Sequence, residues 1–269
     1  MHPTAITLHD TLDPARAAAL WATLGLGGAA PGAGGPLPPF FHQIYFWAPQ
    51  PPDNLGRDGH PAVDPTGGGL IPDMGLPRRM WAGGRLHFHA PLHAGQPATK
   101  TTTLESAERK QGRSGALGFV TLRHDIHQND ALCVTEHQDL VYCGDPAPGS
   151  APQPPPAPTD ETAHQTVQFD STTLFRYSAL TFNGHRIHYD ADYARKVEGY
   201  AGLVVHGPLL AQHLMLMATA RLGPLAGFDF RLTAPLICGN AAVLCAKGKT
   251  FWVRGPGGQQ CITAQAKAR

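Results

Sequence analysis

The sequence contains few charged residues. Only 15% of its 269 residues are Asp, Glu, Lys or Arg, and the formal net charge is +1. No local cluster of basic residues makes up for this, so electrostatic binding to nucleic acid or to an anionic membrane surface is excluded. We therefore expect neither a nucleic-acid nor a membrane partner.

Paired cysteines and long apolar runs are also missing. The N-terminus has no basic segment followed by an apolar core, and no stretch of about 18 uncharged apolar residues occurs, so we expect a soluble, cytoplasmic protein. Without any CxxC spacing the cysteines suggest neither a thiol-ligated zinc site nor a disulfide framework. We expect them to be reduced and mostly buried. They are Cys133, Cys143, Cys238, Cys245 and Cys261.

Glycine and proline, by contrast, are abundant, with 31 and 26 residues. Together with the low charge they indicate a compact chain with tight turns and long ordered loops. Asp13-Pro14 before an alanine-rich run to Leu24 and Gly25 predicts a short opening helix. Residues 27–84 form a predicted long loop packed on a core, because they carry many aromatics. These are Phe40, Phe41, Tyr45, Phe46, Trp47 and Trp81.

Short segments rich in Thr, Val, Leu and Phe come next and predict antiparallel strands at Thr101–Glu105, Leu117–His124 and Ala131–Tyr142. The stretch Gly144–Pro158 is dominated by Pro, Ala and Gly, with hardly a large side chain, which is typical of a linker. We divide the chain accordingly into an N-terminal domain (residues 1–143), a linker (144–160) and a C-terminal domain (161–269).

The C-terminal domain is predicted to begin with helices and to continue as an antiparallel meander. A helix is expected near Ser171–Leu180, a short one around Asp192–Lys196, and a longer one from Pro208, with apolar residues at helical spacing. The predicted strands are Phe228–Thr233, Ala241–Lys247, Thr250–Val253 and Gln260–Ala264.

One internal echo indicates a duplicated architecture. Residues 90–95 and residues 234–239 share the pattern A-P-L-x-x-G, and each copy comes after a predicted strand. Six positions can also agree by chance, but the strand-rich surroundings of both copies favour a repeat.

The densest group of polar residues lies at 177–190 and is followed by Val204-Val205-His206-Gly207-Pro208. Three histidines, His185, His188 and His206, occur within it. His185 and His188 have a spacing that could bind a metal on a helix, but Gly184 disfavours a regular helix and no carboxylate completes a metal motif. We predict no bound metal.

This segment resembles the MaoC-like hydratase and dehydratase family, whose signature S-G-D-x-N-P-L-H precedes a short helix and V-H-G. Here the residues are T-F-N-G-H-R-I-H, so the resemblance implies that His188 is the catalytic histidine. Asn183 stands where most members have a catalytic aspartate, and we predict Asn183 and His188 as the catalytic residues. The match covers roughly residues 175–217.

The segments Leu76–Arg85 and Phe175–His185 resemble the two-repeat branch of that family, with its mitochondrial hydroxyacyl-thioester dehydratases and bacterial mesaconyl- or itaconyl-coenzyme A hydratases. The resemblance implies an α+β double hot-dog fold in which only the second repeat is catalytic. A homodimer is expected on the same basis. The predicted substrate-binding residues are Arg79, Trp81, Arg176, Tyr177, Val205, His206 and Gly207.

The chemistry can be argued from the residue types. Hydration of a double bond conjugated to a thioester needs a base for water and an acid for the alpha carbon, and His188, with an ordinary pKa of about 6.5, can play either role. A backbone N–H at Gly207 can stabilise the enolate-like oxygen. Asn183 cannot accept a proton as a carboxylate does, but it can orient water.

Several of these residues can instead have purely structural roles. His185 can simply satisfy a loop carbonyl, and His206 can fix the turn into the helix. Arginines near the site can be solvated or cap carbonyls, or one or two can bind a substrate carboxylate. The arginines in question are Arg78, Arg79, Arg85, Arg176 and Arg186.

The function predicted from the sequence is a hydro-lyase acting on a short acyl-CoA, with a branched dicarboxylic enoyl-CoA favoured as substrate. Mesaconyl-C4-CoA or itaconyl-CoA would give citramalyl-CoA. The alternatives are a 3-hydroxyacyl-thioester dehydratase of fatty acid synthesis and a non-catalytic hot-dog protein that binds acyl thioesters. No cofactor is expected, because water addition needs no redox group and coenzyme A is part of the substrate.

Overall fold

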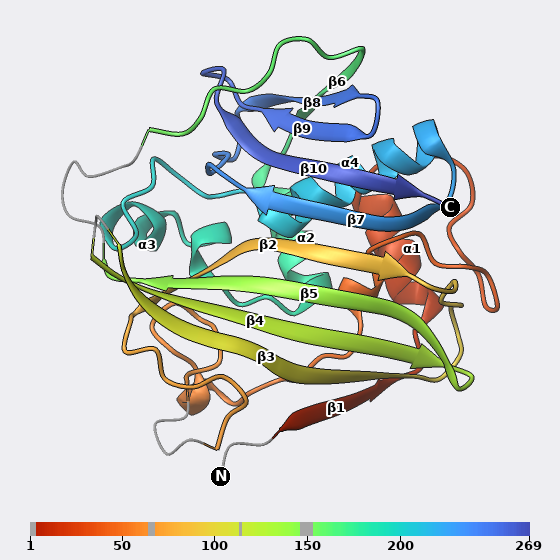
Figure 1. The fold of residues 1–269 in the computed structure, drawn as a ribbon, viewed down its shortest axis with the longest axis horizontal. Helices are drawn as coiled ribbons and strands as arrows, with labels where there is room; N and C mark the ends of the chain where they lie inside the picture. Colours follow the sequence, from red (N-terminus) through yellow and green to blue (C-terminus); the bar gives the residue numbers. More distant parts are fainter. Residues whose placement is uncertain (1–3, 64–67, 113–114, 146–152) are drawn as a thin grey trace.

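A ten-stranded antiparallel sheet runs through the whole computed structural model, which describes residues 4–63, 68–112, 115–145 and 153–269. Its strand order is β1-β3-β4-β5-β2-β7-β10-β9-β8-β6 (Figure 1). The strands are β1 (Ala5–Asp10), β2 (Arg78–Phe88), β3 (Ala98–Gly112), β4 (Gly115–Gln128), β5 (Ala131–Cys143), β6 (Ala163–Gln168), β7 (Leu225–Leu232), β8 (Ala241–Lys247), β9 (Thr250–Arg254) and β10 (Gln260–Ala268).

The strand order repeats itself about the centre of the sheet. Strands β1-β3-β4-β5-β2 form one half, strands β6-β8-β9-β10-β7 form the other in the same order, and β2 joins β7. At this join Gly83 lies so close to β7 that a Cβ there would be 2.5 Å from the Phe230 carbonyl oxygen, so glycine permits the approach. The arrangement is the predicted α+β double hot-dog fold.

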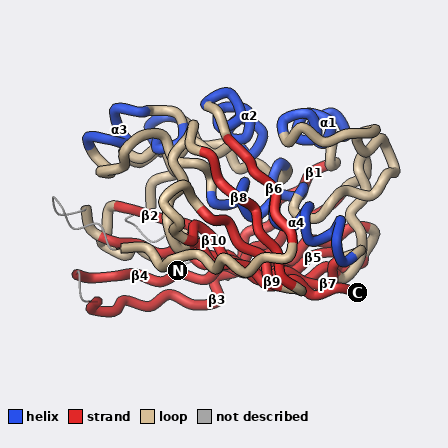
Figure 2. The backbone as a smooth tube through the Cα atoms, turned by 90° about the horizontal axis from the view of Figure 1, so that it is seen from above, coloured by secondary structure: helices blue, strands red, loops and turns tan. Residues whose placement is uncertain are grey.

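The helices lie on one face of the sheet, as Figure 2 shows from above. Three of them begin at an aspartate whose carboxylate accepts a hydrogen bond from a backbone N–H of the first turn: Asp13 for α1, Asp170 for α2 and Asp190 for α3. The elements are α1 (Pro14–Thr23), η1 (Phe41–Ile44), η2 (Pro52–Asn54), α2 (Ser171–Thr181), η3 (Arg186–His188), α3 (Ala191–Lys196) and α4 (Gly207–Leu222). The four predicted α-helices are thus confirmed.

Helix α4 is the central element of the second half. It packs against β7, β9 and β10, and seven of its residues are buried, among them Leu209, Leu210 and Leu214. Burying about 100 Å² of apolar surface contributes roughly 2–3 kcal/mol, so this packing fixes where the helix begins. The position of Gly207 at that start depends on it.

The strands differ from the prediction in three ways. The end of the supposed loop, from Arg78 to Gly84, belongs to β2. The edge strands β1 and β6 were missed because most of their residues are exposed, so they lack the apolar alternation that marks a half-buried strand. Strand β3 is also longer than predicted, since its second half is polar and exposed.

The two A-P-L-x-x-G segments occupy equivalent turns, which confirms the repeat. The N–H of Ala90 donates to the carbonyl of Cys133, and that of Ala234 donates to the carbonyl of Cys261, each at 3.2 Å. Both turns end in a glycine with positive φ, 77° at Gly95 and 83° at Gly239.

The predicted linker lies between β5 and β6, and its residues 146–152 are outside the described residues. The next stretch lies along the second half of the sheet, where Trp252 Nε1 donates to the Pro158 carbonyl at 3.1 Å. All five cysteines are free, three of them buried. Among the described residues no helix has the length and apolar character that crossing a bilayer requires.

Candidate active site

A cavity of about 1000 Å³ lies where the two halves meet. The first half contributes His60, Arg79 and Trp81 to its lining, and the second contributes the α2–η3 segment and the start of α4. Seven of the nine predicted site residues line it, and Arg176 and His206 do not. Those seven are Arg79, Trp81, Tyr177, Asn183, His188, Val205 and Gly207.

His188 is held as a base. Its Nδ1 lies 2.7 Å from the carbonyl oxygen of Val204. A carbonyl only accepts, so Nδ1 carries the hydrogen and Nε2 of the neutral ring keeps its lone pair. The side chain is buried, and burial lowers the pKa of His188 to about 4, although the Val204 carbonyl acts in the opposite direction. The ring therefore stays neutral at physiological pH, with Nε2 unprotonated.

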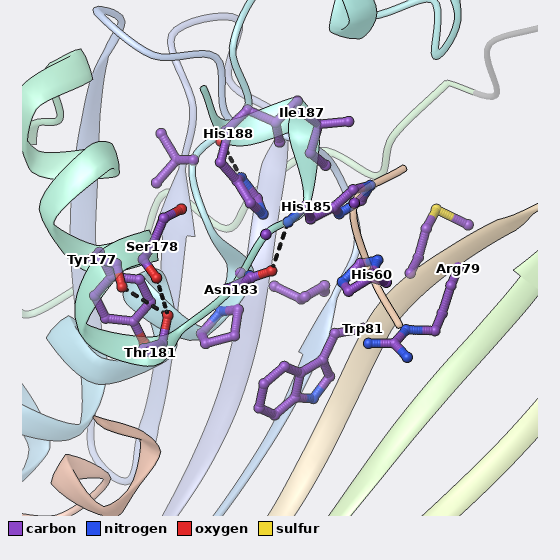
Figure 3. Close-up of a pocket in the computed structure, with 18 of the residues that line it drawn as sticks. His60, Arg79, Trp81, Tyr177, Ser178, Thr181, Asn183, His185, Ile187 and His188 are labelled. Carbon is purple, nitrogen blue, oxygen red and sulfur yellow. Dashed lines mark hydrogen bonds between the residues drawn. The ribbon is translucent and has the colours of Figure 1, made fainter. Parts of the chain in front are cut away.

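His188 belongs to a row of histidine rings. His60 and His185 have ring centroids 4.4 Å apart, and His185 meets His188 edge to face at 5.4 Å. On its other side His188 stacks on His206 at 3.6 Å. Figure 3 shows His60, His185 and His188 one after another along the cavity. Burial lowers the pKa values of His185 and His206, and the neighbouring rings lower them further because charging one ring disfavours charging the next.

His206 lies behind the cavity rather than in it. It is fully buried, and its Nε2 is 2.8 Å from the hydroxyl of Ser178 on α2. Its stacking on His188 and its place directly before α4 make it a support for the His188 ring. This geometry agrees with the role of fixing the turn into the helix.

Asn183 lines the cavity, and a hydrogen bond fixes the orientation of its amide group. Its Oδ1 accepts a hydrogen bond from the backbone N–H of His185 at 3.0 Å, which settles the orientation of the amide because that partner can only donate. No other hydrogen bond of the side chain is found within the described part of the chain. The Nδ2 group is thus available as a donor to water or substrate.

Gly207 begins α4, and its backbone N–H has no hydrogen-bond partner among the residues that the structure describes. The N–H groups of Leu209 and Leu210 both donate to the His206 carbonyl, and Pro208 has none. The N–H of Val205 donates to Leu236, so it is not available to a ligand. A Cβ at position 207 would lie 2.2 Å from Leu232 Cδ1, which explains the glycine.

The five arginines considered from the sequence differ in whether they line the cavity. Four of them are engaged elsewhere or lie off the cavity: Arg78 pairs with Glu198, Arg85 with Asp139, Arg186 with Asp190, and Arg176 is exposed on α2. Arg79 alone of the five lines the cavity, and among the described residues it pairs with no carboxylate. Figure 3 shows its guanidinium beside Trp81 and His60.

Aromatic side chains shape the rest of the cavity. The indole N–H of Trp81 donates to the Gly83 carbonyl at 2.8 Å, which leaves the ring as an apolar wall. The Tyr177 hydroxyl is buried without a hydrogen-bond partner among the described residues, and burial raises its pKa. Phe175 and Phe182 line the cavity yet are 65% and 53% exposed, so they lie at its mouth.

Sequence reasoning missed Asp58 and His60, which lie in the loop before β2. The Asp58 carboxylate bonds His60 Nδ1 at 2.9 Å. Asp58, His60 and His185 present donor atoms within 4.8 Å of one another, the best candidate metal ligands among the described residues. The direct Asp58–His60 hydrogen bond satisfies both groups without an ion, and the charge of the nearby Arg79 opposes a cation. The cluster therefore fits acid–base chemistry better than metal binding.

The comparisons with known proteins show the family of this chain. Residues 40–238 match the model of the family "hydroxyacyl-thioester dehydratase type 2". The mesaconyl-C(4)-CoA hydratase of Chloroflexus aurantiacus is 48% identical over 233 residues, 85% of this chain and 81% of that protein. The mitochondrial hydroxyacyl-thioester dehydratase type 2 of Schizosaccharomyces pombe is 26% identical, covering 81% and 80% of the two chains.

Solved structures show the same fold. HtdX of Mycobacterium tuberculosis superposes with a TM-score of 0.69 at 19% identity, over 98% of this chain and all of that one. A second protein from that organism, with a double hot-dog fold, has a TM-score of 0.61 at 14% identity, over 99% and 95% of the two chains. Because the family model covers residues 40–238 and a relative is 48% identical over 85% of this chain, the chain belongs to the hydroxyacyl-thioester dehydratase type 2 family of MaoC-like hydratases and dehydratases, and it is a carbon–oxygen lyase.

Proposed function

We propose that this protein adds water to a branched dicarboxylic enoyl-CoA of the mesaconyl-C4-CoA or itaconyl-CoA type and forms citramalyl-CoA. Three features support the proposal: the acid–base residues, the anion-stabilising helix start, and a single cationic side chain in the cavity. The 48% identity to a mesaconyl-C(4)-CoA hydratase supports the same substrate class.

The proposed mechanism assigns each group one role. His188 Nε2 removes a proton from water while the water oxygen bonds to the beta carbon. Asn183 Nδ2 donates a hydrogen bond to that water and holds it near His188. The negative charge that develops on the thioester oxygen is stabilised by the Gly207 N–H and the positive end of the α4 dipole.

Arg79 is the observation that carries the substrate assignment. A guanidinium that lines the cavity and pairs with no carboxylate of the described residues is a ready partner for the second carboxylate of a dicarboxylic acyl group. A purely aliphatic acyl chain would leave this charge without a partner inside the cavity, which is unfavourable.

Hydration of mesaconyl-C4-CoA and of crotonyl-CoA by the wild type and by Arg79→Gln tests the assignment, with loss of enoyl-thioester absorbance as the readout. We expect kcat/KM for mesaconyl-C4-CoA to fall about 10- to 100-fold in the variant, the value of a charge-assisted hydrogen bond. Hydration of crotonyl-CoA should stay within about twofold. Equal losses on both substrates would contradict the role of Arg79.

A second candidate is dehydration of 3-hydroxyacyl thioesters in fatty acid synthesis. The names of the 26% identical yeast proteins and of the family favour it. The crotonyl arm of the same experiment decides: a wild type that prefers crotonyl-CoA over mesaconyl-C4-CoA has this second function. A homodimer stays a prediction, and the elution volume of the purified chain measures it.

A further inference from the structure

The loop between η2 and β2 reaches from the first half onto the catalytic segment of the second. The backbone N–H of Arg186 donates to the Asp58 carbonyl at 2.8 Å. Next to this bond Gly59 and Gly184 touch, and a Cβ on Gly59 would lie 2.0 Å from the Gly184 carbonyl oxygen. Backbone contacts therefore fix the loop against the residues directly before His188.

Within this loop both carboxylate oxygens of Asp58 form hydrogen bonds with His60. Oδ2 bonds the ring Nδ1 at 2.9 Å, and Oδ1 accepts from the His60 backbone N–H at 3.1 Å. The carboxylate is buried, with Asp58 only 8% exposed. Since Nδ1 is committed to the carboxylate, Nε2 is the ring nitrogen left for the cavity that His60 lines. A carboxylate orients an imidazole in this way in catalytic triads.

His60 and His188 are therefore held by different partners. His188 Nδ1 faces a neutral carbonyl, whereas His60 Nδ1 faces a carboxylate that stabilises its imidazolium form. Burial and the charge of Arg79 together hold the pKa of His60 below its ordinary value, against the opposing effect of Asp58. The ring of His185, tilted by 41° with its centroid 4.4 Å away, also faces His60. A substrate carboxylate bound to Arg79 would offset that residue's charge and help His60 to keep a proton.

We propose that His60, positioned by Asp58, is the second acid–base residue of the reaction and takes the place of the carboxylate that Asn183 lacks. This inference rests on the proposed function. As water adds to the beta carbon and gives its proton to His188, the electron pair of the double bond moves onto the alpha carbon and the thioester oxygen. The His60 imidazolium then donates its Nε2 proton to the alpha carbon. Return of the proton from His188 to His60 closes the cycle, with one water consumed.

The test is the pH dependence of hydration between pH 5 and 9 for the wild type, His60→Gln and Asp58→Asn. His164→Gln, an exposed position on β6 far from the cavity lining, is the matched control. An acid must be protonated, so the wild-type kcat should fall on the alkaline side. His60→Gln should lower kcat about 100-fold or more, change KM by less than threefold, and remove the alkaline limb. Asp58→Asn, which keeps the shape of the loop, should move that limb to lower pH, because the imidazolium loses its carboxylate.

The remaining outcomes overturn the proposal. A His60→Gln enzyme with wild-type kcat, or variants that lose activity without any change in the alkaline limb, would show that His60 is not the acid. Loss of wild-type activity on dialysis against a chelator, with recovery on addition of Zn²⁺, would assign Asp58, His60 and His185 to a metal instead. Inactivity of both the wild type and His164→Gln on every enoyl thioester would refute the proposed function itself, which is a different result.

Discussion

The two halves of the molecule have the same strand order but diverge after one equivalent strand-like segment. The N–H of Leu37 donates to Leu92 at 2.7 Å, as the N–H of Val205 donates to Leu236 at 2.8 Å. This equivalence places Pro38 and Pro39 where the second half has His206 and Gly207. Beyond this point the second half continues as the 16-residue helix α4, and the first continues as the four-residue η1.

The difference explains why only the second half offers a backbone donor at the start of a central helix. Pro38 and Pro39 carry no N–H, so the first half cannot present a donor like that of Gly207. Without a central helix, the first half instead sends the loop before β2 across to the second half, where His60 and Asp58 meet the His185 segment. One half thus supplies the reaction centre, and the other supplies a wall, a cation and a second imidazole.

The largest effect expected from this comparison is at His188. His188→Ala should lower kcat about 100- to 10,000-fold, because it removes the base that takes the proton from water. His93→Ile, which gives the first half the residue that Ile237 provides in the second, should leave kcat within about twofold. Enoyl-thioester hydration measures both.

Asn183→Asp sharpens the same prediction. An aspartate keeps the acceptor for the His185 N–H but removes the Nδ2 donor, so kcat should fall only about 2- to 10-fold, the value of one neutral hydrogen bond. If Asn183→Asp costs as much activity as His188→Ala, the amide has a larger role than holding water.

The next effect concerns how the two halves are held together. Arg78 on β2 pairs with Glu198 at 2.5 Å, with both side chains at most 10% exposed. Arg78→Met leaves a buried carboxylate without its partner, and the free energy of unfolding should fall by about 3–5 kcal/mol. The comparison variant is Arg85→Met, on the same strand β2 as Arg78. It breaks the more exposed pair of Arg85 with Asp139 of β5 and should lower the free energy of unfolding by less than about 1 kcal/mol. Urea unfolding measures both, and equal costs would contradict the distinction.

Much of the second half could be predicted from the sequence because its signals are local. Helices α2, α3 and α4 are marked by caps, apolar spacing and glycines within a few residues of their ends. The catalytic segment is recognisable by its motif, and the structure places His188 and Asn183 in the cavity. The edge strands β1 and β6 were not predicted, because exposed strands carry no apolar pattern.

Asp58 and His60 could not be found in this way. Their contacts are with residues 184–186, more than a hundred positions along the chain, and no local pattern encodes so distant a meeting. The sequence contains one indication of this pair. An aspartate stands two residues before a histidine, in a loop region whose many aromatic residues indicate an ordered loop. The same distance explains why Arg79 could not be separated from Arg78 and Arg85 until their partners were seen.

The smallest effect tests the repeat itself, through the equivalent glycines Gly95 and Gly239. Both have positive φ, so alanine at either position should cost about 1 kcal/mol in the free energy of unfolding. At Gly239 an added Cβ meets nothing within 4 Å, whereas at Gly95 it lies 3.3 Å from the Cβ of Ala33. Gly95→Ala should therefore cost a few tenths of a kcal/mol more, measured by urea unfolding. Ala33 lies in the glycine-rich segment of the first half that takes the place of the segment carrying Asn183 and His188 in the second. A smaller cost at Gly95 than at Gly239 would mean that this segment moves away from the added methyl group. The two turns would then have the same shape but different packing.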